Sequence, residues 1–336
     1  MLNLHLLECT IKGYDHISDL LLAKYWVITG CKYSDCTNLS TITIGELVSS
    51  IENSAFSCCE KLSSIIIPDA VTTIGEKTFS GCKLLASVVI GKNITTINKS
   101  AFEFCSSLSS IYISDLSAWC NIDFIYDRAN PLYNGGKLYL ENKIISNLVI
   151  PDGIVNIKDY AFYGCSSIEQ VEINNSVKTI GVHAFGSCKT LTSVTIGSSV
   201  NSIGQSAFAV CDALTSITIP NAVTTIGRFA FSPCKSLTSV TIGDGMTTIG
   251  GEMFYGCHAL TSITIGKNVT SIVDAAFQST SITEFYSNAT VPPSFDDYTF
   301  YGSIKDGAIL YVPKDCKIKY ESTRWSNLFT NIEEIH

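Results

Sequence analysis

The chain is 336 residues long, carries a formal net charge of −8 at pH 7, and only 15% of its residues are charged. Its Lys and Arg residues form no basic stripe, which argues against nucleic acid as a partner. No apolar run approaches the length of about 18 residues that a membrane-spanning helix needs.

Residues 1–29 depart from the pattern of the remaining chain, and we expect them to form an N-terminal cap. The segment from Asp19 to Trp26 is amphipathic and predicts a helix, whereas Ile28 already stands one repeat period before Ile51. The first five residues, Met1 to His5, lack the basic-then-apolar layout of a secretory signal peptide. An intracellular chain, a chain without its export segment and a fragment of a longer protein all remain open.

A 23-residue repeat occupies residues 30–113 and 139–285. Its marker is a phenylalanine that recurs once in every period, apart from one longer interval between Phe102 and Phe162. A fixed period of this length predicts a solenoid, whose core is buried only when each repeat stacks on the next. The phenylalanines that we expect at buried corners are Phe56, Phe79, Phe102, Phe162, Phe185, Phe208, Phe231, Phe254 and Phe277.

Two short apolar segments in each repeat predict the two walls of the solenoid. Leu214, Ile217 and Ile219 follow a Leu-x-x-Ile-x-Ile pattern, and its alternation is typical of a strand with one buried face. A Val-x-x-Ile-Gly segment supplies the second wall, and Ala-Phe-x-x-Cys forms the corner. Because identical strands recur at one period, we expect them to pair in parallel and in register, about 4.8 Å apart. The predicted fold class is therefore a mainly β repeat solenoid with a parallel sheet and short helical caps.

The full motif, Leu-x-x-Ile-x-Ile-Pro-x-x-Val-x-x-Ile-Gly-x-x-Ala-Phe-x-x-Cys, resembles the repeat of the BspA-like (treponemal-type) leucine-rich repeat family. The resemblance covers about residues 30–285. It implies a curved, right-handed solenoid with a parallel sheet on one face. It also implies a secreted or cell-surface protein that serves in adhesion and protein binding, although members of one fold family share the scaffold more than the function.

Residues 114–138 interrupt the array. The interval between Phe102 and Phe162 equals two periods plus 14 residues, and Tyr139 stands one period before Phe162, so we expect one repeat to be expanded into a loop. Insertions in solenoids often project from the binding face. Two interpretations stay open, because Trp119 and Phe124 either anchor a partner or fold back onto the repeat that they interrupt.

The strongest candidate for a partner-binding surface lies at this interruption. Trp, Tyr and Arg are the residue types most enriched among interface anchors. On the neighbouring strands, apolar residues occupy an exposed position where later repeats carry Thr, as at Thr195, Thr218, Thr241 and Thr264. Those later threonines predict flat ladders of hydroxyl groups, which are the alternative contact surface. The candidate partner-binding residues are Ile66, Val89, Tyr112, Trp119, Tyr126, Arg128 and Tyr133.

Residues 286–336 leave the repeat pattern and predict a C-terminal cap. Ala308 to Pro313 predicts a last strand, and Lys314 to Asn327 predicts one helix.

The cysteines are placed by the repeat and do not indicate a metal site. Nine of the 14 cysteines occupy the same repeat position, among them Cys188, Cys211 and Cys234, and Thr280 and Ser303 take this position in the last repeats. In-register side chains in neighbouring strands point the same way, which disfavours disulfides, so we expect a ladder of buried thiols.

No arrangement of residues indicates catalysis or a cofactor. The five histidines lie in the caps or at variable repeat positions, and no pair of cysteines has the Cys-x-x-Cys spacing of a zinc site. We therefore expect a monomeric, non-enzymatic scaffold for protein–protein interaction that binds a protein or a glycan. The alternative is a structural or carbohydrate-contacting surface module.

Overall fold

The structure, a computed structural model, describes residues 27–28 and 33–335. The helix predicted at Asp19–Trp26 lies outside the described residues. Residues up to Ile145 form one compact unit together with Lys158–Ser167, and Ser146–Ile157 forms the second with the residues from Ile168 onward. Each unit is a mainly β, parallel solenoid.

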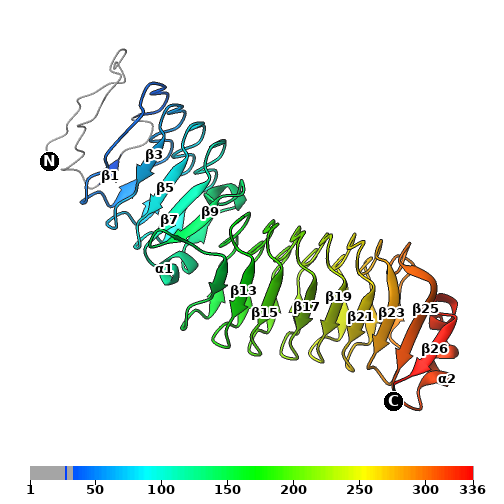
Figure 1. The fold of residues 1–336 in the computed structure, drawn as a ribbon. Helices are drawn as coiled ribbons and strands as arrows, with labels where there is room; N and C mark the ends of the chain where they lie inside the picture. The colour runs from blue at the N-terminus through cyan, green and yellow to red at the C-terminus, as the bar shows by residue number, and fades with distance from the viewer. Residues whose placement is uncertain (1–26, 29–32, 336) are drawn as a thin grey trace. The chain divides into compact units, whose positions relative to one another are not determined.

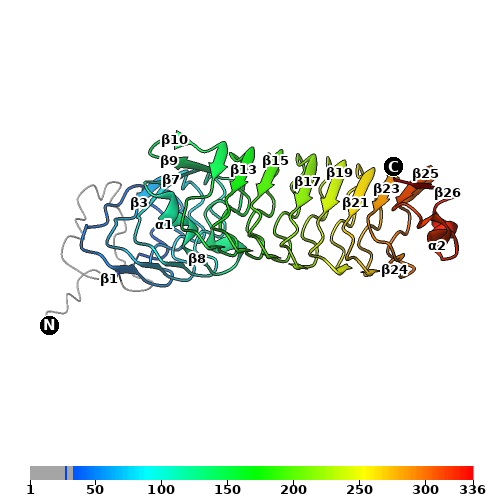
Figure 2. The ribbon, with the colours of Figure 1, turned by 90° about the horizontal axis from the view of Figure 1, so that it is seen from below.

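In the first unit, two sheets form opposite walls of the solenoid (Figure 1). Figure 2 shows β7 and β9 along one wall and β1 and β8 along the other. One sheet, which we call the exposed-face wall, contains β3 (Ser64–Ile66), β5 (Ser87–Ile90), β7 (Ser110–Ile113), β9 (Lys137–Leu140) and β10 (Lys143–Ile144). The opposite wall contains β1 (Val27–Ile28), β2 (Ser50–Ile51), β4 (Thr73–Ile74), β6 (Thr96–Ile97) and β8 (Asp123–Phe124).

The second unit has the same two walls. One wall contains β11 (Asn147–Val149), β13 (Gln170–Ile173), β15 (Ser193–Ile196), β17 (Ser216–Ile219), β19 (Ser239–Ile242), β21 (Ser262–Ile265), β23 (Ile282–Ser287), β25 (Ile304–Val312) and β26 (Asn331–Glu334). The other wall contains β12 (Asn156–Ile157), β14 (Thr179–Ile180), β16 (Ser202–Ile203), β18 (Thr225–Ile226), β20 (Thr248–Ile249), β22 (Ser271–Ile272) and β24 (Ser294–Phe295).

Strand pairing follows the period of the sequence repeat, as predicted. Val88 pairs with Ile65 and with Ile111, each one period away, and all three side chains are buried. Ile28 pairs with Ile51 in the opposite wall, which confirms that the period already applies at Ile28. The alternation of buried and exposed residues explains this register, because a slip of one residue would turn the isoleucines toward solvent.

The corners are filled by stacked aromatic rings. Phe208 is fully buried, and its ring stacks on Phe185 at 5.2 Å and on Phe231 at 5.4 Å between centroids. In the first unit, Tyr33, Phe56, Phe79 and Phe102 form an equivalent stack, with 5.3 to 5.5 Å between neighbouring centroids. The nine phenylalanines predicted for this position are all fully buried.

Most corners also place two residues in the left-handed backbone conformation, which the repeat pattern did not predict. One stands two residues before the corner phenylalanine, as at Lys77 and Phe229 (φ 55° and 57°), and the other two residues after it, as at Phe104 and Val210 (φ 60° and 59°). Glycine occupies the second position at Gly81 and in a few other repeats, whereas most repeats use a non-glycine residue. Glycine was therefore too rare at these positions to reveal the turn.

The interruption of the array has a different arrangement from the one predicted. Ser110 pairs with Lys137, which stands more than one period later, and Tyr112 pairs with Tyr139, so Tyr139 lies in a strand of the exposed-face wall. The assignment of Tyr139 to the corner position was wrong, because Lys137–Leu140 repeats the alternation of Ser110–Ile113 and pairs with it. Four of the additional residues lie between β7 and β8, where α1 (Leu116–Cys120) forms. The other ten are residues 137–146, which comprise β9, β10 and their turns, because Asn147 in β11 is again one period before its partner Gln170. There β10 pairs with β9 in antiparallel orientation.

The C-terminal segment ends the second unit with two short helices instead of the one predicted. These are α2 (Lys317–Glu321) and α3 (Trp325–Leu328). The hydroxyls of Ser322 and Thr323 each donate to the carbonyl three residues earlier, at 2.8 Å, and such bonds compete with a continuing helix. The strand predicted at Ala308–Pro313 is β25, which starts earlier than expected. Contrary to the prediction, it is not the last strand, because β26 follows the two helices and pairs with β25 in parallel.

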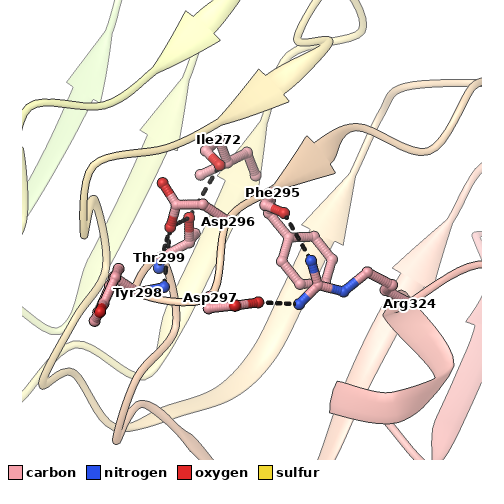
Figure 3. A network of polar contacts seen from close by, with 7 residues as sticks. All are labelled: Ile272, Phe295, Asp296, Asp297, Tyr298, Thr299 and Arg324. Atoms are coloured by element: carbon pink, nitrogen blue, oxygen red, sulfur yellow. Dashed lines mark hydrogen bonds and ion pairs between the residues drawn. The ribbon is translucent and has the colours of Figure 1, made fainter.

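A polar network joins this segment to the preceding repeat (Figure 3). Asp296 accepts hydrogen bonds from the backbone nitrogens of Tyr298 and Thr299, and the Thr299 hydroxyl lies within 2.9 Å of the Ile272 carbonyl. Partial burial of Asp296 opposes its ionisation, but hydrogen bonds to the carboxylate outweigh it and lower its pKa. Arg324 pairs with Asp297, as the dashed line in Figure 3 shows.

Candidate functional site

An uninterrupted row of apolar and aromatic side chains crosses the exposed face of the first unit. Ile66 pairs with Val89, Val89 with Tyr112, and Tyr112 with Tyr139, all as partners in register. The antiparallel hairpin adds Ile144 opposite Tyr139. Partners in register point to the same side of a sheet, so these five residues form one strip, which we call the apolar row.

The apolar row is accessible to solvent. Ile66 is 64% exposed, Ile144 is 49% exposed and Val89 is 36% exposed, whereas Tyr112 and Tyr139 are partly buried. The two tyrosine rings stack at 4.8 Å between centroids. Stacking holds the rings in place and covers one face of each, so the apolar row combines a rigid aromatic centre with aliphatic ends.

The same strand position is polar in the second unit. Thr195, Thr218 and Thr241 are exposed there, as predicted for the hydroxyl ladders, whereas Thr264 is only partly exposed. Glu172 is an exposed glutamate at the same position. A neighbouring threonine ladder has a structural role that the sequence analysis missed. The hydroxyl of Thr238, for example, donates to the Thr215 carbonyl in the preceding repeat at 3.0 Å. These hydroxyl hydrogens are therefore used between repeats and are not available to a ligand.

Trp119 is not part of an exposed surface. Asp115 caps the helix α1 by accepting a hydrogen bond from the Ala118 nitrogen at 2.9 Å, and the helix turns Trp119 inward. Trp119 is 1% exposed, packs on the buried Phe124 at 5.1 Å, and donates from Nε1 to the Ala161 carbonyl at 3.0 Å. Trp119 and Phe124 therefore fold back onto the repeat that they interrupt, and their two buried rings complete its core.

Tyr126 and Arg128 lie on the corner segment after β8, not on the sheet that carries Tyr112. Tyr126 is 59% exposed, and the Lys99 ammonium lies 5.5 Å from the centre of its ring. Arg128 forms an ion pair with Glu103. The two residues help to line a shallow surface pocket of about 400 Å³ in which three acidic residues face Lys77, Lys99 and Arg128.

Tyr133 occupies a third location. Its hydroxyl accepts a hydrogen bond from the Phe104 nitrogen at 3.1 Å, and partial burial raises the pKa of Tyr133. Phe104 itself is 64% exposed beside it. The seven predicted binding residues are thus divided among the apolar row, the corner segment, the Tyr133 turn and the core. Two members of the apolar row, Tyr139 and Ile144, were missed, although the alternation of Lys137–Leu140 could have revealed the first.

The predicted thiol ladder is present among the described residues, whose cysteines are all free. Its thiols have partners that the sequence did not indicate. The Cys234 thiol donates to the Phe208 carbonyl of the preceding repeat at 3.3 Å, and Ser303 makes the equivalent bond to Phe277 at 2.5 Å. Burial raises the pKa of Cys105 and of Cys257 to about 12. These thiols are therefore protonated at neutral pH and poorly reactive.

We find no group of three or more His, Cys, Asp or Glu residues with the arrangement of a metal site in the described part of the chain. None of the helices described is long and apolar enough to cross a membrane.

Comparisons with known proteins agree with this fold. The family model for the BspA type leucine-rich repeat region matches in six copies, over residues 21–127, 136–232 and 180–306. A comparison with curated proteins found no match. The crystal structure of the pneumococcal vaccine antigen PcpA is 16% identical, with a TM-score of 0.50, and the alignment covers 92% of this chain and 84% of that one.

Two further solved structures are similar. A leucine-rich repeat protein from Bacteroides ovatus is 20% identical over 88% of this chain and 90% of its own, with a TM-score of 0.48. A leucine-rich cell surface protein from Faecalibacterium prausnitzii is 23% identical over 88% of this chain and 86% of its own, with a TM-score of 0.40. Because the family model matches most of the sequence, the chain belongs to the BspA-type leucine-rich repeat family.

Proposed function

We propose that this protein is a non-enzymatic scaffold for protein–protein interaction and that the apolar row of the first unit is its recognition surface. The observation that carries the proposal is the continuity of the row, in which Ile66, Val89, Tyr112, Tyr139 and Ile144 follow one another in register. Adhesion at a cell surface is the biological role that the family resemblance implies, and we include it in the proposal.

Strand propensity alone is a weaker explanation of the apolar row. Threonine is also a good strand former, and it occupies the same exposed position at Thr195, Thr218 and Thr241. Single apolar residues are common on protein surfaces, but contiguous apolar strips are typical of contact sites. Tyrosine in particular buries a large area with few rotatable bonds, which favours it at the centre of protein interfaces.

The residues of the corner segment are outside the proposed surface. Arg128 is paired with Glu103, and the Tyr133 hydroxyl is bonded to the Phe104 nitrogen, so both already have partners within the protein. Trp119 supports the proposal only indirectly, because it stabilises the repeat that follows Tyr112.

The test replaces residues of the apolar row by the threonine that other repeats carry at this position. Partners would be captured with the full chain from host-cell or extracellular-matrix material, identified, and re-tested as purified proteins. We expect the double substitution Tyr112→Thr and Tyr139→Thr to weaken binding at least about tenfold, since the two tyrosines are the central anchors. The matched control is Thr195→Ala with Thr218→Ala, which changes the same strand position in the second unit.

Unchanged binding of the double tyrosine variant, with an intact far-ultraviolet circular dichroism spectrum, would contradict the proposed surface. Loss of binding after enzymatic removal of glycans from the captured partner would favour the carbohydrate-contacting alternative. A variant that loses its spectrum is replaced by Ile66→Thr, because Ile66 is 64% exposed and its substitution should preserve the fold.

A further inference from the structure

A second aromatic group lies at the C-terminal end of the second unit. Tyr286 in β23 pairs with Tyr311 in β25, and Tyr311 pairs with Glu333 in β26, so all three side chains point to the same side of the sheet. The tyrosine rings stack at 4.4 Å between centroids with an angle of 9°. Both tyrosines are partly exposed, and Glu333 is exposed.

A surface pocket of about 490 Å³ opens beside these rings. Carboxylates dominate its surroundings. Glu333 and Glu334 line the pocket, and Glu284 lies next to it, since it accepts a hydrogen bond from the Tyr286 hydroxyl at 3.3 Å. The residues that line the pocket are Tyr286, Tyr311, Lys317, Glu333, Glu334 and Ile335.

Among the described residues that line this pocket, the one cation is Lys317, which acts electrostatically on Glu334 but cannot balance the charges of Glu284, Glu333 and Glu334 together. The Lys317 ammonium lies 3.8 Å from Glu321, so it is shared with a carboxylate outside the pocket. Backbone hydrogen bonds from Lys317 and its neighbours lower the pKa of Glu334, which keeps this group ionised. Burial and the nearby charge of Glu284 raise the pKa of Tyr286, which keeps its hydroxyl protonated. The pocket therefore combines flat aromatic rings with an excess of negative charge.

From this combination we infer that the pocket binds an arginine side chain presented by a protein partner. A guanidinium group is planar, stacks on aromatic rings and pairs with carboxylates through two parallel hydrogen bonds. Tyr311 offers the ring and Glu333 the carboxylate on the adjacent strand. This site is separate from the apolar row, because its residues belong to the second unit and its tyrosine pair is flanked by carboxylates instead of aliphatic side chains.

The experiment uses the full chain with tyrosine rings labelled with ¹³C, and follows their NMR signals during titration with short acetylated peptides. One Gly/Ser peptide carries two arginines, a second carries citrulline in their place, and a third carries lysine. We expect saturable shifts of the Tyr286 and Tyr311 signals with the arginine peptide, weaker binding of the lysine peptide, and no saturable shift with citrulline, which has the same shape without the charge. The signals are assigned with Tyr286→Phe and Tyr311→Phe.

Variants separate the site from a general attraction of cations to an acidic protein. Glu333→Gln should weaken binding of the arginine peptide about two- to fivefold, and Tyr311→Ala should do so to a similar extent. The matched control is Glu172→Gln, because Glu172 is an exposed glutamate at the equivalent strand position of an earlier repeat, and it should leave the affinity unchanged.

Equal weakening by Glu172→Gln and Glu333→Gln would overturn the inference, because it would reduce the binding to net charge. Equal shifts with the citrulline peptide would also overturn it. If maltose shifts both tyrosine signals and competes with the arginine peptide, the rings contact carbohydrate and the assignment to arginine fails. If Tyr311→Ala fails to fold, Glu333→Gln decides the question, because that side chain is exposed and its removal spares the core.

Discussion

Substitution of Phe208 by alanine tests the central feature of the fold, the stack of aromatic rings in the corners. Phe208 is fully buried, and its ring lies between those of Phe185 and Phe231 at 5.2 Å and 5.4 Å. Replacement of a buried phenylalanine by alanine costs about 3–5 kcal/mol in transfer and cavity terms. Because Phe208→Ala also removes two stacked ring pairs, we expect a loss at the upper end of this range, about 5 kcal/mol.

Equilibrium unfolding in urea, followed by circular dichroism, measures this effect. Phe104→Ala is the matched control, because Phe104 belongs to the same repeat motif but is 64% exposed, and we expect it to change the free energy of unfolding by less than about 0.5 kcal/mol. Phe208→Leu should lie between the two. A loss below about 1 kcal/mol for Phe208→Ala, or a loss equal to that of Phe104→Ala, would refute the reasoning that the ring stack stabilises the array.

Four further predictions concern thiols, pH and backbone strain. Brief alkylation of the folded protein at about pH 8, followed by peptide mapping, should show modification of Cys58, which is partly exposed. Cys105 and Cys257 should remain unmodified until denaturant is added. Burial raises the pKa of Cys105 and Cys257 to about 12, so the stability that these buried thiols contribute is complete below about pH 8.5 and is lost as the pH rises toward 12. The melting temperature should therefore fall steeply above about pH 9. A melting temperature that does not change with pH in this range would contradict the buried ladder. Val210→Gly should raise stability by about 1 kcal/mol, since a β-branched residue is strained at φ 59°, and a lower melting temperature would show that packing of the valine matters more. Because the pKa of Asp296 is lowered in the folded protein, this carboxylate stabilises the fold above about pH 4, and the stabilisation is lost as the pH falls through the pKa of the folded state. The difference in melting temperature between wild type and Asp296→Asn should therefore shrink in acid. A difference that stays constant would refute the assignment.

Much of the architecture follows from periodicity. The regular recurrence of Phe, Cys and the Ile-x-Ile pattern places each strand opposite an identical one, and pairing such as Val88 with Ile65 and Ile111 follows directly. Thr280 and Ser303 replace cysteine at the common repeat position, which indicates a preference for a small side chain with a hydrogen-bond donor. The hydrogen bond of Ser303 to the Phe277 carbonyl shows the physical reason, since the donor at this position points at a buried carbonyl.

The interrupted repeat marks where periodic reasoning failed. Tyr139 stands one period before Phe162, yet it pairs with Tyr112 in β7. Counting residues along the sequence treats the insertion as one shift of the repeat. Strand pairing instead depends on which segment alternates so that it can bury its leucine against the neighbouring strand. Residue type alone could not decide the role of Trp119, because an aromatic residue in an insertion can either be buried or anchor a partner. In the structure Trp119 is 1% exposed.

The sequence by itself determined the elements that depend on local pattern: the repeat length, the strands, the buried phenylalanines and the polar character of the later exposed faces. Repeat counting also placed Ile66, Val89 and Tyr112 at one exposed strand position, but only the tertiary structure decided which residues outside the regular repeats share a surface with them. It joined Ile66 to Ile144 in a single row, and it placed Tyr311 beside Glu333 on the adjacent strand. The physical reason is that burial imposes a repeating constraint on each residue along the chain, whereas an exposed surface is defined by the neighbours that folding places around it.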